Sequence, residues 1–187
     1  MSRPPTALRG RKGRGMGSHQ NYDGDSVEWY TPPGIFTALG LTFDLDPAAP
    51  VGGLDWVPAA RHYSIDDDGL TQPWEGRVWL NPPYGPNTER WMRKLAAHGS
   101  GVALVFARTE TAWWHETIVA SDAVCFIAGR LTFLTAAGTP ALYNAGAPSA
   151  LVAYGADCAE ALATSGLGMT FGVRSRALDY QATLWEG

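Results

Sequence analysis

The segment from Val78 to Tyr84 joins an apolar run to residues whose side chains and carbonyl groups could do chemistry. Asn81 offers an uncharged carbonyl oxygen that accepts hydrogen bonds, and Pro82 offers a backbone carbonyl whose direction is restricted by Pro83. Tyr84 offers a ring face on which a planar heterocycle can stack. Two acceptors beside an aromatic ring suit a planar amino group, which becomes more nucleophilic when both its N–H bonds are accepted during attack. The alternative is a proline-rich turn in which Tyr84 only packs on the surface.

Apolar stretches alternate with helical patterns along the chain, which predicts an α/β fold with a mostly parallel sheet. A first helix is expected to have Thr31 as its N-cap and Pro32 at its first position, and to end at Gly40. Strands are expected at residues 41–45, 77–80, 102–106, 123–127 and 150–154, with residues 131–134 extending the sheet as a hairpin. Further helices are expected at 88–98, 109–120 and 157–164, and residues 50–76 as a loop. Because ligands bind beyond the carboxyl ends of parallel strands, residues 81–84 fall where a site is expected.

Charge is distributed unevenly along the chain. Residues 1–20 contain no acid and five basic residues: Arg3, Arg9, Arg11, Lys12 and Arg14. The remaining residues hold nine basic and eighteen acidic side chains, within a net charge of -4 for the whole chain. We therefore predict a disordered basic arm over residues 1–25, suited to a polyanion, and one domain over 26–187. The alternative for the arm is an unstructured leader whose arginines are incidental, and an acidic body requires any nucleic-acid contact to be local.

Composition argues against several classes of protein. No run approaches the roughly 20 apolar residues of a membrane helix, and the N-terminus lacks the apolar stretch of a secretory signal, so a cytoplasmic location without membrane contact is expected. Cys125 and Cys158 are far apart and predict two isolated thiols, with a single disulfide as the alternative. The four histidines show no metal-ligand spacing, so no metal is expected.

Three short segments carry a resemblance to a known class of enzymes. Asn81-Pro82-Pro83-Tyr84 after an apolar strand resembles the catalytic motif of S-adenosylmethionine (SAM)-dependent amino methyltransferases. Thr31-Pro32-Pro33 resembles the helix start that contacts the methionine end of SAM in these enzymes, and Asp46-Pro47-Ala48-Ala49 resembles the acidic turn after their first strand. The longer stretches EWYTPPGIF, FDLDPAA, DDGLTQPWEGRVWLNPPYG, VALVFARTETAWWHE, GRLTF and APSALVAYG are together similar to the phage-type (Dam-like) DNA N6-adenine methyltransferase family over residues 28–155.

The resemblance implies a Rossmann-like methyltransferase fold, shortened because only 34 residues separate Asp46 from Asn81. It implies methylation of adenine N6 in DNA with SAM as methyl donor, in the host cytoplasm if the protein is phage-encoded. Asn81 and the Pro82 carbonyl would hold the amino group of an adenine flipped out of double-stranded DNA, with Tyr84 stacking on the base. The alternatives are the same chemistry on cytosine N4, RNA adenine or protein glutamine, and a nucleic-acid-binding protein without turnover. The oligomeric state, monomer or dimer, stays open.

The same resemblance implies two further sets of site residues. The cofactor set is Tyr30, Thr31, Pro32, Asp46, Pro47, Ala48, Asn81 and one member of the acidic run 66–68, with Asp67 favoured. The DNA set is Arg108, Thr109 and Arg130, which follow strands; Tyr143 and Asn144 in the loop 135–148; and Arg11, Lys12 and Arg14 in the basic arm. The alternatives are a solvated loop for the acidic run and surface or helix-cap salt bridges for Arg108 and Arg130.

Overall fold

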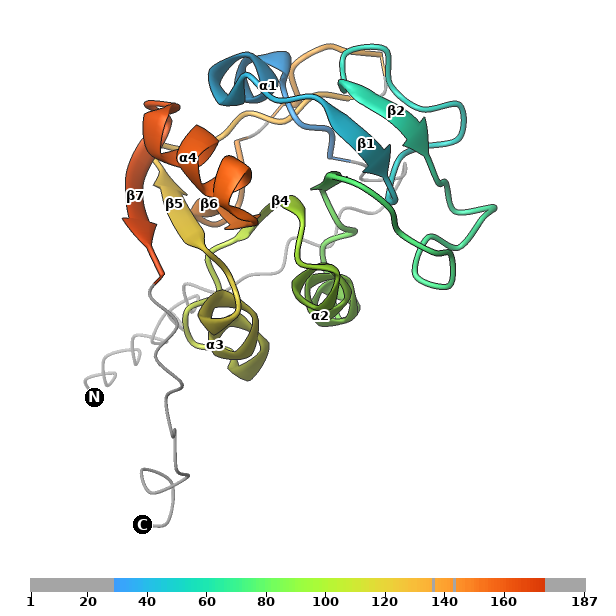
Figure 1. Ribbon diagram of the computed structural model, residues 1–187. Helices are drawn as coiled ribbons and strands as arrows, with labels where there is room; N and C mark the ends of the chain where they lie inside the picture. Colours follow the sequence, from blue (N-terminus) through green and yellow to red (C-terminus); the bar gives the residue numbers. More distant parts are fainter. Residues whose placement is uncertain (1–28, 136, 143, 174–187) are drawn as a thin grey trace, which may run out of the picture.

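The computed structural model describes residues 29–135, 137–142 and 144–173 (Figure 1). Its strands are β1 (Phe43–Asp46), β2 (Ala59–His62), β3 (Val78–Leu80), β4 (Gly101–Phe106), β5 (Ala123–Ile127), β6 (Ser149–Tyr154) and β7 (Gly168–Gly172). They form one sheet in the order β2-β1-β3-β4-β6-β5-β7. The pairs among β2, β1, β3 and β4 are parallel, whereas β6 is antiparallel to β4 and β5, and β7 is antiparallel to β5. Five of the seven strands therefore point the same way, and the expected Rossmann-like α/β class is confirmed.

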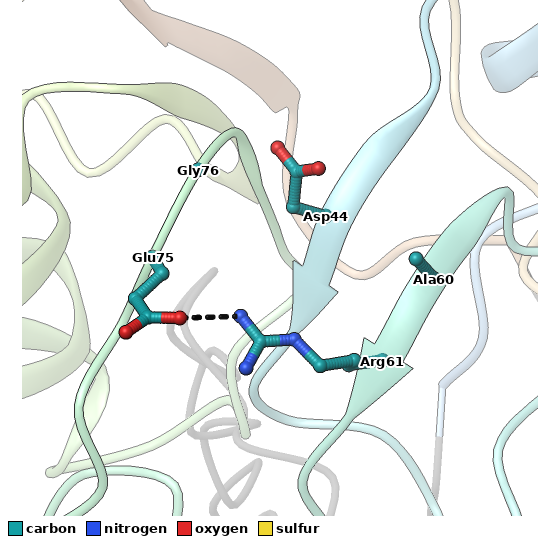
Figure 2. A pocket seen from close by; sticks show the side chains of 5 residues that line it. All are labelled: Asp44, Ala60, Arg61, Glu75 and Gly76. Carbon is teal, nitrogen blue, oxygen red and sulfur yellow. Dashed lines mark hydrogen bonds and ion pairs between the residues drawn. The ribbon is translucent and has the colours of Figure 1, made fainter.

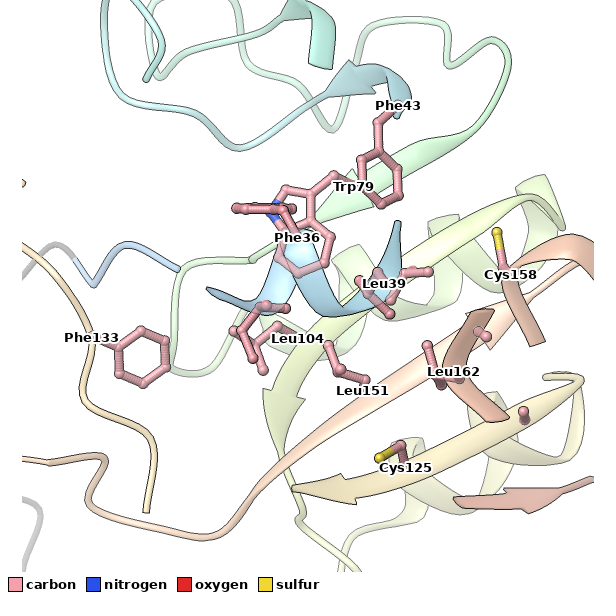
Figure 3. Close-up of a cluster of buried hydrophobic side chains, with 14 of the residues drawn as sticks. Phe36, Leu39, Phe43, Trp79, Leu104, Cys125, Phe133, Leu151, Cys158 and Leu162 are labelled. Carbon is pink, nitrogen blue, oxygen red and sulfur yellow. The ribbon is translucent and has the colours of Figure 1, made fainter. Parts of the chain in front are cut away.

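The helices are α1 (Pro33–Leu39), α2 (Thr88–His98), α3 (Ala112–Val119) and α4 (Ala156–Thr164), and they cover both faces of the sheet (Figure 1). On one face, Phe36 of α1 and Leu162 of α4 pack with Leu104 and Leu151 of the sheet (Figure 3). On the other face, α2 and α3 contribute Trp91, Met92, Leu95 and Trp114 to a second cluster. Burial on both faces is why β3 and β6 are continuous apolar runs.

The helix predicted at residues 88–98 is confirmed as α2. Thr88, Trp91, Met92 and Leu95 are buried and recur at helical spacing, so one face of the helix packs on the sheet. Gly99 ends it in the left-handed conformation, with φ of 77°. None of the helices in the described ranges is long and apolar enough to cross a membrane.

The start of α1 differs from the prediction by one residue. The helix begins at Pro33, and Pro32 occupies the N-cap position with φ -68° and ψ 144°. A residue that precedes proline is restricted to extended conformations, so Pro33 keeps Pro32 out of the helix. Thr31 therefore does not cap α1, although the predicted end at Gly40 is confirmed by its φ of 62°.

Two strands were not predicted. Strand β2 lies inside residues 50–76, which we expected to be a loop, and it pairs with β1 at the edge of the sheet. Its residues are largely exposed, so they carry no apolar alternation that could indicate a strand. Strand β7 lies beyond the last predicted helix, at the opposite edge, and contains two glycines. Strand β1 is also displaced from the predicted 41–45.

The expected extension of the sheet by residues 131–134 is wrong. Leu134 forms isolated bridges with Tyr30 and Pro140 instead. The physical reason is that β5 already has β6 on one side and β7 on the other, so it has no free edge. Helix α3 also starts later than predicted, at Ala112, because the preceding residues form a turn in which the Thr111 amide donates to the Arg108 carbonyl at 2.9 Å.

The stretch between β2 and β3 contains no helix, and α2 holds it in place. The Lys94 ammonium donates to the carbonyls of Gly69, Leu70 and Gln72 at 3.2, 2.7 and 2.6 Å. It also lies 4.7 Å from the centroid of the Trp74 ring. The region between β1 and β3 is thus shortened to one strand and an anchored loop.

Cys125 and Cys158 are both buried and free (Figure 3), as predicted. The basic arm, with Arg11, Lys12 and Arg14, lies outside the described residues, as does Tyr143.

Candidate active site

The carboxyl ends of β1 and β3 lie side by side where the strand order reverses. From β1 the chain moves outward to β2 and then returns to β3 on the other side of β1. Leu45 pairs with Val78 in a parallel register, so Asp46, the last residue of β1, and Asn81, which follows β3, lie at the same edge. Ligands of open α/β sheets bind at such a switch point. The structure therefore brings together two residues that have 34 other residues between them in the sequence.

Asn81 presents an oriented hydrogen-bond acceptor. Its Nδ2 donates to the Trp29 carbonyl at 2.7 Å, and because a carbonyl can only accept, this bond identifies the amide nitrogen. Its Oδ1 is buried and has no hydrogen-bond partner within the described part of the chain. An unsatisfied buried acceptor costs about 1–3 kcal/mol. A planar N–H donor from a ligand would satisfy it.

Tyr84 forms an aromatic platform beside Asn81. Its ring stacks on that of Phe106 with centroids 4.2 Å apart and an interplanar angle of 24°. The ring of Phe133 meets it edge-on at 5.8 Å. Burial raises the pKa of the Tyr84 phenol far above its usual value, so this group stays neutral and offers a ring rather than an acid or base. Sequence reasoning missed Phe106, although an aromatic residue at the end of the neighbouring strand was a usable signal.

Pro82 and Pro83 are held by the first turn of α2. The Thr88 hydroxyl donates to the Pro83 carbonyl at 3.0 Å and accepts from the Gly85 amide at 3.1 Å. Pro82 itself is buried. The turn after β3 is therefore fixed in conformation, as a site with a preset acceptor requires.

Asp46 is a buried carboxyl group at the end of β1. Its Oδ1 accepts from the Ala48 amide at 3.1 Å, and no Lys, Arg or His of the described residues forms an ion pair with it. Burial raises the pKa of Asp46 to about 7, and the Ala48 hydrogen bond opposes this only in part. An ammonium group or hydroxyl donor from a ligand would stabilise its ionised form.

The predicted cofactor segment Tyr30–Pro32 lies against the same edge. Tyr30 exchanges backbone hydrogen bonds with Leu134 at 3.1 and 2.8 Å. The Thr31 carbonyl accepts from Trp56 Nε1 at 3.0 Å, whereas its hydroxyl is buried and has no partner among the residues described. Together with the bond from Asn81 to Trp29, these contacts join the segment to residues 81–84.

One protein-family model, described as DNA N-6-adenine-methyltransferase (Dam), matches residues 18–157, which is well over half of the 187 residues. The chain belongs to this family. The resemblance noted in the sequence is thereby confirmed, and membership implies an enzyme that methylates DNA adenine at N6 with SAM. No curated protein and no solved structure matches the chain significantly.

The residues of this Dam-family chain fit SAM at the switch point. The Thr31 hydroxyl is buried without a partner among the described residues, and the buried Asp46 carboxyl has the Ala48 hydrogen bond but no ion pair there. The amino-acid end of SAM carries a carboxylate and an ammonium that would pair with these groups. We find no comparable set for a metal: no group of three or more His, Cys, Asp or Glu in the described ranges is arranged to hold an ion.

The acidic run 66–68 lies beyond the carboxyl end of β2 and is exposed, and Gly69, which follows it, packs against the Asp46 turn. A Cβ atom at Gly69 would lie 2.0 Å from the Pro47 carbonyl oxygen, so only glycine permits this approach. Asp67 Oδ2 accepts from the Ser64 amide and hydroxyl at 2.8 and 3.0 Å. These bonds lower the pKa of Asp67 and shape the turn. The sequence did not identify this run as following a strand, because residues 50–76 were expected to be a loop.

The described members of the predicted DNA set follow β4 or β5 or precede β6, so they share this edge. Arg108 forms an exposed ion pair with Glu110 at 3.7 Å, and Arg130 Nη1 donates to the Ala145 carbonyl at 3.4 Å. Asn144 Oδ1 accepts from the Thr132 hydroxyl at 2.6 Å. The Thr109 carbonyl bonds to His115 Nε2 at 2.9 Å. Their contact with DNA stays a prediction.

A shallow depression elsewhere on the surface is lined by none of the predicted site residues. It is formed by Asp44, Ala60, Arg61, Glu75 and Gly76 (Figure 2). Arg61 and Glu75 pair at 3.3 Å with both side chains exposed. The Asp44 and Leu45 amides both donate to the Arg77 carbonyl, at 2.8 and 3.4 Å, and the Asp44 side chain is exposed. Arg61 and Glu75 of this depression pair with each other, whereas buried polar groups at the switch point lack partners within the described structure. We therefore place the candidate active site at the switch point.

Phe133 links Trp29 to Tyr84 in the candidate active site. It is fully buried and meets Trp29 and Tyr84 edge-on, with centroids 5.7 and 5.8 Å away. Trp29 supplies the carbonyl that orients Asn81. Phe133 is thus a positioning residue for both the amide and the ring.

We expect Phe133→Leu to weaken SAM binding and to lower turnover at saturating SAM, each about 10-fold or more, because small displacements of positioned groups are costly. Calorimetric titration and a methyl-transfer assay measure the two effects. Phe126→Leu is the control, since Phe126 contacts Trp114 and Phe171 and packs on the opposite face of the sheet. Wild-type SAM affinity and turnover in Phe133→Leu would show that Phe133 positions neither group.

Proposed function

We propose that this chain transfers the methyl group of SAM to N6 of an adenine that is flipped out of double-stranded DNA into the switch-point edge. The observation that carries the proposal is the buried Asn81 Oδ1, which is oriented by its own amide and has no partner in the described structure. It lies next to the neutral aromatic platform of Tyr84 and Phe106. An acceptor beside a ring face suits the exocyclic amine of a base.

Asn81 and the Pro82 carbonyl act by accepting the two N–H bonds of that amine. Accepting both favours the pyramidal nitrogen that develops during attack, so the stabilisation is larger in the transition state than in the ground state. SAM, when bound, supplies the electrophilic methyl group. Tyr84 stacks on the base and keeps it in plane with the acceptors. No strong base is required, because the proton is lost after the nitrogen has become cationic.

The cofactor is held by the segments on either side of the motif. Tyr30, Thr31 and Pro32 contact its methionine part, and the Asp46-Pro47-Ala48 turn receives its ammonium group. An acid of the run 66–68, with Asp67 favoured, contacts its ribose or adenine. The position of this run, next to Gly69 that packs on the Asp46 turn, supports the assignment.

DNA is bound across the same edge. Arg108, Thr109 and Arg130 contact phosphates or flanking bases, Tyr143 and Asn144 contact bases, and Arg11, Lys12 and Arg14 of the basic arm add non-specific attraction. Extrusion of the adenine is required because its N6 lies inside the base stack of a duplex. The enzyme acts on specific sequences in the cytoplasm, that of the host if a phage encodes it.

The proposal is tested by incubating the protein with SAM and unmethylated duplex DNA and digesting the product to nucleosides. N6-methyladenine is the expected product, and sequencing of the methylated DNA gives the recognised site. N4-methylcytosine as the product, or methylation of RNA or protein alone, would replace the proposed acceptor. Binding of SAM without any methylated product from DNA of random sequence would overturn it.

A further inference from the structure

A third unpartnered polar group lies at this edge and has no role in the function proposed so far. Ser149, the first residue of β6, is 2% exposed. Its hydroxyl is buried, and no residue of the described chain forms a hydrogen bond with it. The other two such side-chain groups are Thr31 Oγ1 and Asn81 Oδ1, both already placed in the active site.

The register of the sheet places Ser149 beside the aromatic platform. Strand β6 is antiparallel to β4, and Ser149 lies directly opposite Phe106. Residues that are opposite each other in an antiparallel pair project from the same face of the sheet. Leu151 and Ala153 follow at the alternate positions and lie in the core cluster against which Tyr84 and Phe106 pack. The Ser149 side chain therefore projects on the face of the Tyr84–Phe106 stack.

The unpaired hydroxyl of Ser149 lowers the stability of the folded protein. A buried hydroxyl without a partner is less stable than a methyl group of similar size, so alanine would serve this position better. Ser121 shows the usual arrangement: it is 4% exposed, and its hydroxyl donates to the Ile118 carbonyl at 2.7 Å. An unpaired hydroxyl beside a proposed base platform indicates a partner that arrives with the substrate.

We propose that the Ser149 hydroxyl donates a hydrogen bond to a ring nitrogen of the flipped adenine while Asn81 holds its amino group. The inference rests on the proposed function and adds a base-reading residue to it. Asn81 follows β3 and Ser149 begins β6, two strands away, which is about 10 Å across the sheet. Adenine N6 and N3 lie about 4 Å apart, so a hydrogen bond of about 3 Å at each of these atoms spans a comparable length.

The test compares two buried serines. Ser149→Ala is expected to lower kcat/KM for duplex DNA by about 10- to 100-fold, with unchanged SAM affinity and a melting temperature that does not fall, because an unpaired hydroxyl is removed. Ser121→Ala loses a satisfied hydrogen bond and is expected to lower the melting temperature while leaving kcat/KM unchanged. Deaza analogues then identify the contacted atom. With 1-deaza-, 3-deaza- or 7-deazaadenine at the target position, one analogue should remove the difference between wild-type and Ser149→Ala enzymes.

The outcomes separate this inference from the proposed function. If the wild-type enzyme makes no N6-methyladenine, the proposed function fails. If the wild-type enzyme is active and Ser149→Ala matches it on duplex DNA, the base-reading role is wrong. If Ser149→Ala loses activity together with SAM affinity or thermal stability, the role of Ser149 is structural and the inference is equally overturned.

Discussion

Replacing Asn81 with alanine is expected to lower the rate of methyl transfer at saturating SAM by about 10²–10³-fold, the usual effect of removing one preorganised hydrogen-bonding group from a reacting centre. The reason is that Oδ1 is the buried acceptor, already oriented by the bond from Nδ2 to the Trp29 carbonyl. Single-turnover measurement at saturating SAM isolates this loss from any change in cofactor affinity.

Asn87→Ala provides the matched control for this experiment. Asn87 is exposed and its side chain does not cap α2, although it occupies the N-cap position. It lies close to the motif in sequence, so a general disturbance of this loop would affect both variants. A wild-type rate in Asn81→Ala would remove Asn81 from the mechanism.

Asp46→Asn is expected to stabilise the protein and to weaken SAM binding. In the folded chain the pKa of Asp46 is about 7, above the ordinary value of 3.8, because burial disfavours the charged form. Between pH 4 and 7 the folded state therefore holds the proton that the unfolded state has lost, and the stability of the wild-type protein falls as pH rises. Above pH 7 the cost reaches about 4 kcal/mol. Asparagine avoids this cost because it stays neutral and still accepts from the Ala48 amide.

Urea unfolding of wild-type and Asp46→Asn proteins from pH 4 to 8 measures the difference. The gain in the free energy of unfolding should be near zero at pH 4 and largest above pH 7. Asp44→Asn is the control, because Asp44 is exposed and also accepts a backbone N–H, from Arg77 at 2.6 Å. A gain in Asp46→Asn that does not vary with pH would contradict the burial of an ionisable group. Wild-type affinity for SAM should also fall below pH 7, as the carboxyl is protonated.

These predictions share one physical theme. Asp46, Thr31, Asn81 and Ser149 are buried polar groups with incomplete pairing, and all lie at the carboxyl edge of the sheet. Each lowers the stability of the unliganded protein. Their concentration at one edge is typical of a site prepared for polar ligands, where function is maintained at the expense of stability.

Much of the local structure could be predicted because it depends on neighbouring residues. The apolar spacing of 88–98 specifies α2, Gly40 ends α1, and buried runs specify β4, β5 and β6. Strand β2 could not be predicted, because its residues are largely exposed and only pairing with β1 makes them a strand. The strand predicted at residues 131–134 is absent for the converse reason. These residues have a strand-like composition, but both edges of β5 are occupied by other strands.

For the site, the sequence alone determined the residue types: an amide, two prolines and a ring after a strand, with an acidic turn upstream. Only the tertiary structure decided which of these groups lack partners. The carbonyl that orients Asn81 belongs to Trp29, 52 positions away in the chain. The position of the unpaired Ser149 hydroxyl is defined only once β6 lies beside β4. A residue's chemistry is set by its own atoms, whereas its hydrogen-bond satisfaction and pKa depend on neighbours that folding supplies.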